Sequence, residues 1–499
     1  MTDPATPRLA ISTLRHAAQG TVLPSYDRNT LETGLVHLGL GAFVRAHLAT
    51  YTDDLLALEP GPWGIAGVSL KRPDQRNLLA PQDGLYTALQ RDGTEVRARV
   101  IGCVTAALVA PENPAAVVGR MAHPSCRIVS LTITEKGYCH DPATGFLDPE
   151  HPDIRHDLEH PGSPRSAIGL ITAALRGRAQ AGLSPFTVLC CDNLPHNGAL
   201  VAGLVRDFAA LLGDDGLSAW IEANGAFPST MVDRIVPATT ADDIRDAASA
   251  TGLYDAAPVS HEPFRQWVIE DRFAGERPAW ERVGAELVMD VAPYEHMKLR
   301  LLNGAHSALA YLGYLAGYET IPDVVADPVF PAYLTELWGE IIPVVPPPPG
   351  VDLRGYTGAL LARFANNAIR HRTAQIAMDG SQKLPQRLLA TVRERLVQNA
   401  PISRLALAVA AWVRYIGGID ESGRAIDVRD PLAPRLRATW DAAGPDWGDR
   451  VRAVLRTEAV FGTDLPGDER FAGPVMEAYA LLLNRGARAA VAEARRSGD

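Results

Sequence analysis

The sequence predicts an α/β protein in which a parallel sheet with flanking helices is followed by a mainly α-helical region. Two observations lead to this prediction. Short apolar strands alternate with helical segments over roughly the first 285 residues, which is typical of a parallel sheet covered by helices on both faces. From residue 296 onward, apolar residues recur almost only with helical spacing. We therefore expect two domains, 1–285 and 286–499, in this chain of 499 residues.

The first domain is expected to contain short buried strands, most of them followed by a helix. The thirty residues before the first strand are polar and irregular, which indicates an arm over the surface. The strands are expected at 35–41, 63–70, 96–104 (an edge strand), 127–134 and 186–191, and the helices at 42–58, 111–122, 164–181 and 198–212.

The second domain is expected to be a set of helices joined by short loops. The proline-rich run Val344–Pro349 predicts an extended, polyproline-like connector between two of them. The helices are expected at 296–317, 328–341, 353–368, 384–398, 402–417, 434–442, 448–456 and 469–494.

Composition excludes several classes of protein. Hydrophobic residues make up 47% of the chain, enough for a packed core, so wholesale disorder is excluded. The formal net charge of −10, without a basic face, argues against nucleic-acid binding. Five cysteines without a CxxC pair argue against both a disulfide framework and a structural zinc site. The N-terminus does not resemble a signal peptide and no run of about 18 apolar residues occurs, so we expect a soluble cytoplasmic protein.

A glycine pair lies where the first strand meets the first helix. Gly39 permits a tight turn, and Gly41 would let the backbone approach a pyrophosphate at the helix N-terminus. Val44 stands where the dinucleotide-binding fingerprint has its third glycine. On the motif alone, an ordinary strand–turn–helix is as good an interpretation as a cofactor turn.

The residues after the second strand bear on the choice of cofactor. Asp74 lies at a plausible distance beyond the glycines to contact an adenosine ribose, although a plain loop carboxylate is an equal alternative. Lys71 and Arg72 would suit a 2′-phosphate instead. We expect NAD, with NADP as the alternative.

Three polar side chains occur on a strongly apolar helix in the second domain. Lys298, Asn303 and His306 are spaced by five and three residues, within a broad face of one helix. A lysine there either reaches solvent or is desolvated, and desolvation lowers its pKa toward neutrality, as a general base needs. Three converging polar groups on a buried helix are costly for a purely structural element, which favours the catalytic interpretation.

Two further polar clusters follow predicted strands of the first domain. Asp192–Gly198 comes after a buried strand, at the end where ligands bind in open α/β sheets, and Asn193 could donate to an alcoholate oxygen. A simple turn is the alternative, because Asp and Asn favour local backbone bonding. Glu135 also follows a strand and points either into the same region or into water.

These motifs resemble the polyol-specific long-chain dehydrogenase/reductase (mannitol dehydrogenase) family, over about 35–487. The resemblance implies a Rossmann-like N-terminal domain, a mainly helical C-terminal domain, an active site in the cleft between them, no metal, and a monomer or weak homo-oligomer. The matching stretches are HLGLGAFVRAH, SLTITEKGYC, CDNLPHNG, MVDRIVP, EPFRQWVIED, APYEHMKLRLLNGAHSALAYLGYLAGYETI, HRTAQIAMDGSQKLPQRLL and VFGTDLP.

The resemblance also implies roles for individual residues. Lys298 is similar to the general acid–base of the family, Asn193 and Asn303 to the amides that hold the reacting oxygen, and His306 to the residue that orients the substrate. Glu295 resembles the acidic residue on a proton path to the lysine. The residues that match cofactor contacts are Gly39, Gly41, Phe43, Arg45 and Asp74, and those expected to contact substrate are Asp233, Lys383 and Arg387.

Two branches of the family differ in the far end of the substrate, a carboxylate in fructuronate reductases and a CH2OH group in mannitol 2-dehydrogenases. The segments TEKGYC, HRTAQIAMDGSQKLPQR and LAGYETI are similar to the first branch, and CDNLPHNG to the second. Gln375 stands where mannitol enzymes tend to carry an arginine. Arg370, Arg372, Lys383 and Arg387 could supply a cation for a carboxylate, although Arg370 and Arg372 could equally be surface charges.

We therefore expect an NAD-dependent oxidoreductase that interconverts D-fructuronate and D-mannonate in hexuronate breakdown. Mannitol 2-dehydrogenase, acting on D-mannitol and D-fructose, is the alternative within the family. A catalytically silent module that binds a sugar or a nucleotide is the alternative outside enzymes, and the intact Lys298, Asn303 and His306 set argues against it.

Overall fold

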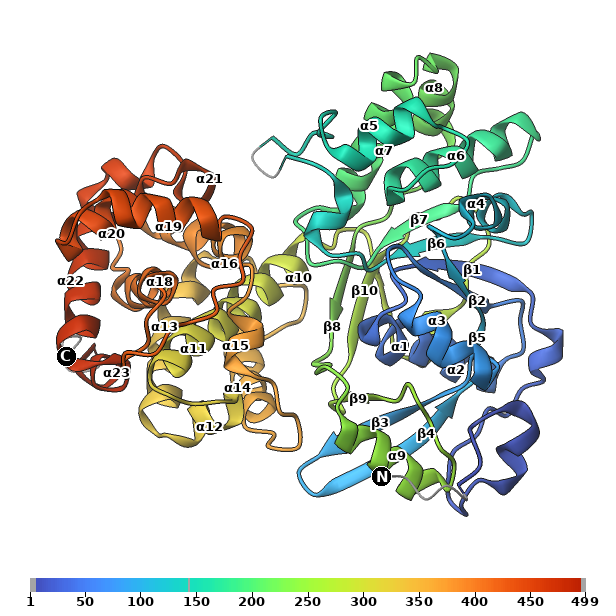
Figure 1. Ribbon diagram of the computed structural model, residues 1–499, viewed down its shortest axis with the longest axis horizontal. Helices are drawn as coiled ribbons and strands as arrows, with labels where there is room; N and C mark the ends of the chain where they lie inside the picture. The colour runs from blue at the N-terminus through green and yellow to red at the C-terminus, as the bar shows by residue number, and fades with distance from the viewer. Residues whose placement is uncertain (1–5, 142–143, 495–499) are drawn as a thin grey trace. The chain divides into compact units, whose positions relative to one another are not determined.

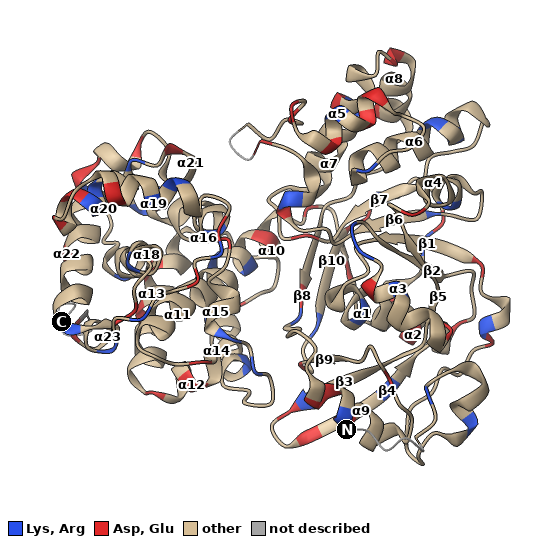
Figure 2. Ribbon diagram, in the orientation of Figure 1, with Lys and Arg blue, Asp and Glu red and all other residues tan. Residues whose placement is uncertain are grey.

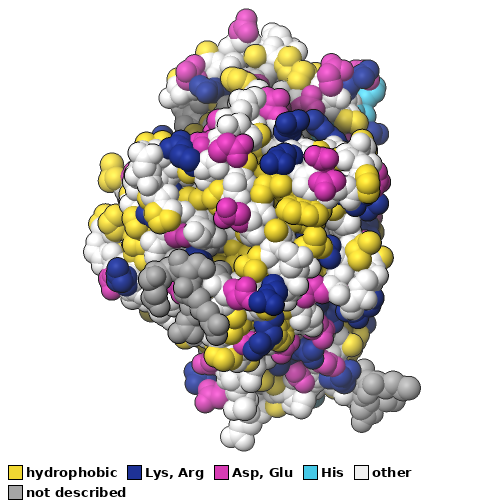
Figure 3. Space-filling view, turned by 90° about the vertical axis from the view of Figure 1, so that its left-hand side faces the viewer, with side chains coloured by type: hydrophobic (Ala, Val, Ile, Leu, Met, Phe, Trp, Pro, Cys, Tyr) yellow, Lys and Arg dark blue, Asp and Glu magenta, His cyan; other side chains and the backbone are white. Residues whose placement is uncertain are grey.

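The computed structural model describes residues 6–141 and 144–494, and the chain divides into two compact units, Met1–Ala292 and Pro293–Asp499 (Figure 1). Each unit has its own arrangement of secondary structure, and unit 1 holds the named strands. Acidic and basic residues are distributed through both units (Figure 2), and on the face drawn in Figure 3 they are intermixed. No helix of the described residues combines the length and the apolar character needed to cross a membrane.

Unit 1 is built on a five-stranded sheet with the order β5-β2-β1-β6-β7, in which every pairing is parallel. The order runs outward from β1 in both directions, which creates a topological switch point between β1 and β6, where open α/β sheets bind ligands. The prediction of a parallel sheet is therefore confirmed. The strands are β1 (Thr33–Leu38), β2 (Gly64–Ser69), β5 (Val104–Val109), β6 (Ile128–Leu131) and β7 (Thr187–Cys190).

Alternate residues of these strands enter two cores on opposite faces of the sheet. On β1, Leu35 packs in one core and Val36 in the other, as the two-residue period of a strand requires. One core contains residues of α4 (Pro114–Ala122), α6 (Ala167–Gln180) and α7 (Asn197–Leu211), and the other contains residues of α1 (Ala42–Ala46) and α2 (Leu48–Leu58). Helices thus cover both faces, as expected from the alternating pattern.

Two three-stranded sheets complete unit 1. The expected edge strand at 96–104 is β4 (Glu95–Ile101), but it lies at the edge of the smaller sheet β4-β3-β9 and not of the parallel sheet. The parallel sheet ends instead on β5, which the sequence analysis did not predict. The remaining elements are β3 (Tyr86–Asp92), β8 (Thr230–Asp233), β9 (Val259–His261), β10 (Gln266–Glu270), β11 (Glu286–Val288), α3 (Asp74–Leu79), α5 (Pro152–Glu159), α8 (Asp215–Asn224) and α9 (Ala241–Thr251).

Unit 2 is helical around one large core, as predicted. Helix α18 (Ser403–Ile416) is buried along nearly its whole length and packs against α11 (Gly304–Leu315) and α22 (Glu469–Arg485). The predicted helix 469–494 is broken at Gly486, which has a φ of +77°. The helices are α10 (Ala292–Met297), α11 (Gly304–Leu315), α12 (Ile321–Ala326), α13 (Val329–Ile341), α14 (Leu353–Phe364), α15 (Thr373–Ile376), α16 (Gly380–Leu384), α17 (Ala390–Val397), α18, α19 (Ala433–Ala442), α20 (Trp447–Leu455), α21 (Glu458–Phe461), α22 (Glu469–Arg485) and α23 (Ala487–Ala494), with π-helical turns at Lys298–Asn303 (η6) and Pro385–Leu389 (η8).

A buried carboxylate joins two helices of unit 1, and its removal provides a test of this packing. Asp157 accepts hydrogen bonds from the backbone N–H groups of Arg165 (2.7 Å) and Ser166 (2.9 Å) and from the Ser166 hydroxyl (2.6 Å). Asp157→Ala leaves these donors unsatisfied, so we expect the free energy of unfolding of unit 1 to fall by about 2–4 kcal/mol. Urea unfolding followed by circular dichroism measures this, with Glu159→Ala as the exposed control in the same helix. Equal unfolding midpoints for the two variants would contradict the assignment.

Candidate functional site

The two glycines of the first turn have different surroundings. Gly39 has a φ of +100°, and a Cβ there would overlap the carbonyl oxygen of Thr132, so only glycine fits beside the end of β6. A Cβ at Gly41 would meet nothing closer than the Gly39 oxygen, at 3.8 Å. Gly39 is therefore required by packing, whereas Gly41 leaves space beside the backbone for an approaching ligand.

A buried histidine supports this turn from inside the sheet. His37, on β1, lies 2.8 Å from the hydroxyls of both Ser130 and Thr132, and the Thr132 hydroxyl donates to the Gly39 carbonyl at 3.1 Å. Thr132 must then accept from Nε2–H of the histidine, while Nδ1 accepts from Ser130. Burial lowers the pKa of His37 to about 3, so the ring stays neutral. No role was predicted for His37, whose only signal in the sequence is that it is a polar residue within an otherwise apolar strand.

Phe43 and Arg45 lie on α1, directly after the turn. The Phe43 ring stacks on His47, with centroids 5.0 Å apart. Arg45 is buried, and its guanidinium donates to the carbonyls of Gly41 (3.2 Å) and Ala257 (2.5 Å). Arg45 therefore supports the backbone of the glycine turn, and its direct contact with the cofactor stays a prediction.

Asp74 begins α3, in the segment that follows β2. Its carboxylate is exposed and lies 3.5 Å from the guanidinium of Arg72, which is also exposed. Such a pair contributes little stability, so the carboxylate can exchange its partner for a ligand hydroxyl.

Asn193 follows β7 at its carboxyl end, in the same loop as Asn197. The side-chain amide of Asn197 donates to the carbonyls of Asp192 (3.0 Å) and Thr230 (2.8 Å), and its oxygen accepts from the Thr230 N–H (3.0 Å). The loop that carries Asn193 is thereby fixed to the first residue of β8. Asp233, the last residue of β8, is buried.

In unit 2, Lys298 and Asn303 begin and end the π-helical turn η6. The predicted continuous α-helix is wrong at this point, because the N–H of Gly304 bonds to the carbonyl of Leu299, five residues earlier. In an α-helix, residues five apart lie roughly 140° apart around the axis, whereas a turn closed by i→i+5 bonds brings them close to one face. The π turn thus aligns Lys298 with Asn303, and π turns are frequent at functional sites.

The π turn η6 packs against the second π turn, η8, at a glycine. A Cβ at Gly304 would lie 2.8 Å from the carbonyl oxygen of Arg387, so a larger residue would separate the two segments. Glu295, on α10, precedes Lys298 by three residues and is also buried.

The candidate catalytic side chains of unit 2 are all buried: Lys298 is 5% exposed, and Asn303 and His306 are each 6% exposed. Within the described part of the chain, Asn303 Nδ2 and His306 Nε2 have no hydrogen-bond partner. Buried polar atoms are normally paired, so two unpaired atoms three residues apart mark a position for ligand oxygens. Both residues were predicted as site residues, but only the structure shows that these two atoms are buried and unpaired.

His306 lies between two rings that the sequence analysis did not assign. It stacks on Phe364 at 4.5 Å and meets His371 edge-on at 5.2 Å. Burial holds the pKa of His306 well below its usual range, and burial lowers that of His371 to about 4. Both rings are therefore neutral near pH 7.

Positive charges contribute to both shifts. Beside burial, the charges of Arg387, Arg363 and Lys298 lower the pKa of His306, and those of Lys383 and Arg387 lower the pKa of His371. We call these four residues, Lys298, Arg363, Lys383 and Arg387, the basic cluster. Arg387 donates to the Ser307 hydroxyl at 3.2 Å, and Lys383 donates to the Met378 carbonyl at 2.5 Å.

Arg370 and Arg372 do not belong to the basic cluster. Both side chains are exposed and lie within 3.6 Å of Glu319. They fit the surface-charge alternative of the sequence analysis.

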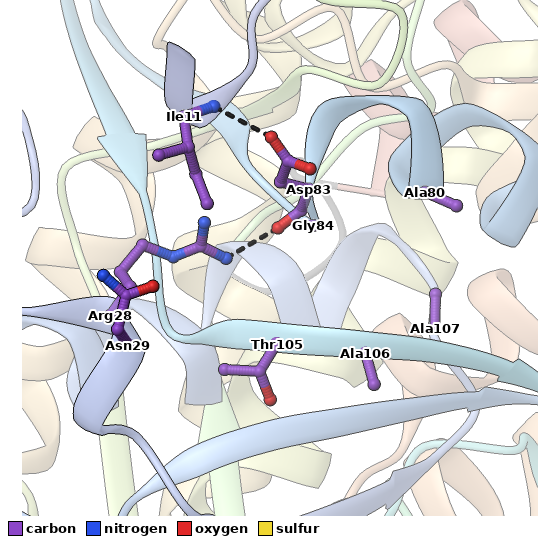
Figure 4. A pocket seen from close by; sticks show the side chains of 9 residues that line it. All are labelled: Ile11, Arg28, Asn29, Ala80, Asp83, Gly84, Thr105, Ala106 and Ala107. Atoms are coloured by element: carbon purple, nitrogen blue, oxygen red, sulfur yellow. Dashed lines mark hydrogen bonds between the residues drawn. The ribbon is translucent and has the colours of Figure 1, made fainter.

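A cavity of about 380 Å³ in unit 1 contains none of the predicted site residues (Figure 4). The guanidinium of Arg28 at this cavity donates to the carbonyls of Asp83 (2.6 Å), Gly102 (2.7 Å) and Val104 (3.0 Å), which gives it a structural role. The lining residues are Ile11, Arg28, Asn29, Ala80, Asp83, Gly84, Thr105, Ala106 and Ala107.

Among the described residues, Cys139, His151 and Asp153 bring potential metal-ligating atoms within 4.8 Å of one another. Burial raises the pKa of the Cys139 thiol to about 12, and Nδ1 of His151 already accepts the N–H of Asp153 at 3.2 Å. A protonated thiol and an occupied ring nitrogen do not favour metal binding, so we assign no metal to this group.

Comparison with known proteins shows the family. Residues 33–282 match the mannitol dehydrogenase Rossmann domain, and residues 290–483 match the mannitol dehydrogenase C-terminal domain. The chain is 48% identical to a D-mannonate oxidoreductase of Escherichia coli, over 94% of this chain and 97% of that protein. It is 40% identical to mannitol dehydrogenase 2 of Saccharomyces cerevisiae, over 97% of each chain.

Among solved structures, the fold is similar to that of Pseudomonas fluorescens mannitol 2-dehydrogenase in a ternary complex with NAD and D-mannitol. The TM-score is 0.92 at 40% identity, covering 97% of this chain and 99% of that one. The sequence resemblance and the predicted fold class are thereby confirmed. The chain belongs to the mannitol dehydrogenase family of oxidoreductases, which act on secondary alcohols.

Proposed function

We propose that this enzyme interconverts D-fructuronate and D-mannonate, with NAD as the hydride carrier. The observation that carries this proposal is the basic cluster around His306 and His371, since guanidinium and ammonium groups are the side chains that hold a substrate carboxylate. The 48% identity to a D-mannonate oxidoreductase supports the same substrate. The relatives named as mannitol dehydrogenases make mannitol and fructose the alternative pair.

The glycine turn fits a dinucleotide. Gly41 leaves room for the pyrophosphate, and Arg45 and His37 fix the backbone around it. Asp74 would accept a hydrogen bond from the adenosine ribose, which favours NAD, while Lys71 and Arg72 keep NADP as the alternative. When bound, the cofactor supplies or accepts the hydride.

The polar residues act on the oxygen of the reacting carbon. In reduction of the ketone, the amides of Asn193 and Asn303 donate to this oxygen as negative charge develops on it. Lys298 then gives a proton to the oxygen, and Glu295 lies on the path by which the lysine regains one. Neutral His306 orients the substrate through Nε2. In oxidation the same lysine, in its neutral form, removes the hydroxyl proton.

Replacement of the lysine tests the acid–base role. Lys298→Ala is expected to lower kcat for D-fructuronate reduction by about 10²–10⁴-fold, because the alkoxide loses its proton donor. Steady-state kinetics with NADH measures the loss, and added primary amines are expected to restore part of the rate. Circular dichroism and NADH titration serve as controls for folding and cofactor binding. Wild-type turnover in this variant would show that Lys298 has another role.

The basic cluster predicts how the enzyme distinguishes substrates. Arg387→Gln is expected to lower kcat/KM for D-fructuronate by about 10–100-fold, the size of a charge-assisted hydrogen bond, and to affect D-fructose much less. Arg372→Gln, which removes an exposed arginine paired with Glu319, is the matched control and is expected to behave as wild type.

The same assays decide between the candidate functions. Faster wild-type turnover of D-fructose than of D-fructuronate would favour the mannitol alternative. No turnover of any ketose or keto acid would favour a silent binding module.

A further inference from the structure

The side chain of Asp192 bridges the ends of two neighbouring parallel strands. Asp192 follows β7, and its carboxylate accepts hydrogen bonds from the loop after β6: from the N–H of Ile133 at 2.8 Å, the N–H of Thr134 at 3.1 Å and the hydroxyl of Tyr138 at 2.6 Å. Leu131 and Cys190 are paired in the parallel register, so both loops start from the same level of the sheet. One carboxylate therefore holds the loop 132–138 against β7.

The loop 132–138 adopts a conformation that needs such support. Thr134 has a φ of +64° and a ψ of +162°, a region that residues other than glycine rarely occupy and that costs about 1–3 kcal/mol. Its N–H donates one of the hydrogen bonds that the Asp192 carboxylate accepts. Strain of this kind persists only where the surrounding contacts fix the backbone, and it clusters at functional sites.

The backbone of Asp192 is also fixed. Its carbonyl accepts from the Asn197 amide, which also pairs with Thr230 at the start of β8. Asn193, the next residue, is thus attached to three strand ends: β7 through the chain, β6 through the Asp192 carboxylate, and β8 through Asn197. Hydrogen-bonded supporting groups of this kind set the orientation of a catalytic donor.

We propose that Asp192 is a positioning residue, whose ionised carboxylate holds Asn193 and the loop 132–138 in the arrangement that hydride transfer requires. This inference rests on the proposed function, because it assigns a task to Asn193. Asp192 itself acts through its neighbours and does not contact the reacting atoms.

The charge state of Asp192 makes the proposal testable. Burial raises the pKa of Asp192 to about 6, against hydrogen bonds from Tyr138, Ile133 and Thr134 that lower it, and the nearby charge of Glu135 adds to the increase. The other titratable groups that face it are the thiols of Cys190 and Cys191, which burial keeps protonated. Below about pH 6 the carboxyl gains a proton among three donors, so the hydrogen bonds that hold the loop 132–138 must rearrange.

Protonation of Asp192 is not expected to unfold the protein. Because the pKa of the folded state is higher than that of the unfolded chain, the folded state binds this proton more tightly, and this group adds stability as the pH falls from 6 toward 4. A loss of activity in this window, without a loss of folding, would therefore report on the position of the loops.

Asp192→Asn tests the proposal by kinetics and by hydrogen exchange. The variant keeps the shape but places an amide donor against the N–H groups, so we expect kcat at pH 7.5 to fall about 10–100-fold with KM within about threefold of wild type. The wild-type fall in kcat near pH 6 should be absent. Amide exchange measured by mass spectrometry should rise in the peptide 132–138 at the same pH. Unchanged exchange in this peptide would overturn the inference.

Tyr138→Phe supplies the second variant. It removes one hydrogen bond that stabilises the carboxylate, so the pKa of Asp192 should rise. The midpoint of the acidic limb in the pH profile of kcat should then move to a higher pH than in the wild type, while kcat at pH 8 stays close to wild type. An unmoved limb would contradict the assignment of this limb to Asp192. Asp157→Asn, another buried carboxylate of unit 1, is the control and should leave the limb in place.

The two measurements separate this inference from the proposed function. If the wild-type enzyme turns over none of the substrates, the proposed function fails, and the exchange experiment still decides whether Asp192 holds the loop. If the wild type is active and Asp192→Asn matches it in rate and pH profile, the positioning role alone fails.

Discussion

Burial of polar groups without full internal pairing is the physical constraint on which the candidate site of unit 2 depends. Asn303 Nδ2 and His306 Nε2 lie inside the protein and have no hydrogen-bond partner in the described residues, at a cost that a folded protein normally avoids. Positive charges from the basic cluster add to the burial and keep His306 neutral. A substrate oxygen that reaches these atoms would form hydrogen bonds with them. The free-energy cost of leaving them unpaired in the free enzyme would then be recovered on binding.

In unit 1 the constraint is on the backbone, which must be held in place where it would approach a ligand. Gly39 passes so near to Thr132 that no side chain fits, and the neutral His37 ring ties the two strand ends together through hydroxyl groups. Asp192 does the same for the next pair of strands with a carboxylate. The carboxyl ends of β1, β6 and β7 are thus supported by polar side chains.

The fold followed from hydrophobic periodicity, because buried parallel strands and amphipathic helices leave strong patterns. The strand β5 was not predicted, since Val104–Val109 follows β4 almost directly and the two read as one strand in the sequence. Periodicity also predicted an unbroken helix at 296–317, because the π turn changes hydrogen bonding without changing which residues are apolar. That turn is what places Lys298 and Asn303 on one face.

The candidate site was predicted only in part. Residue types and the family resemblance identified Lys298, Asn303 and His306, all of which are buried in the structure. The guanidinium of Arg45 is bonded to backbone carbonyls, which no sequence pattern reveals, and its contact with the cofactor stays a prediction. The roles of His37 and His371 depend on contacts between segments that are distant in the sequence, which a local pattern does not show.

The most direct test of the central claim is a crystal structure of the enzyme with NAD and D-mannonate. The account predicts substrate oxygens within hydrogen-bond distance of Asn303 Nδ2 and His306 Nε2, and the carboxylate at the basic cluster. A bound D-mannonate that leaves both atoms unpaired, or that lies away from η6, would contradict it.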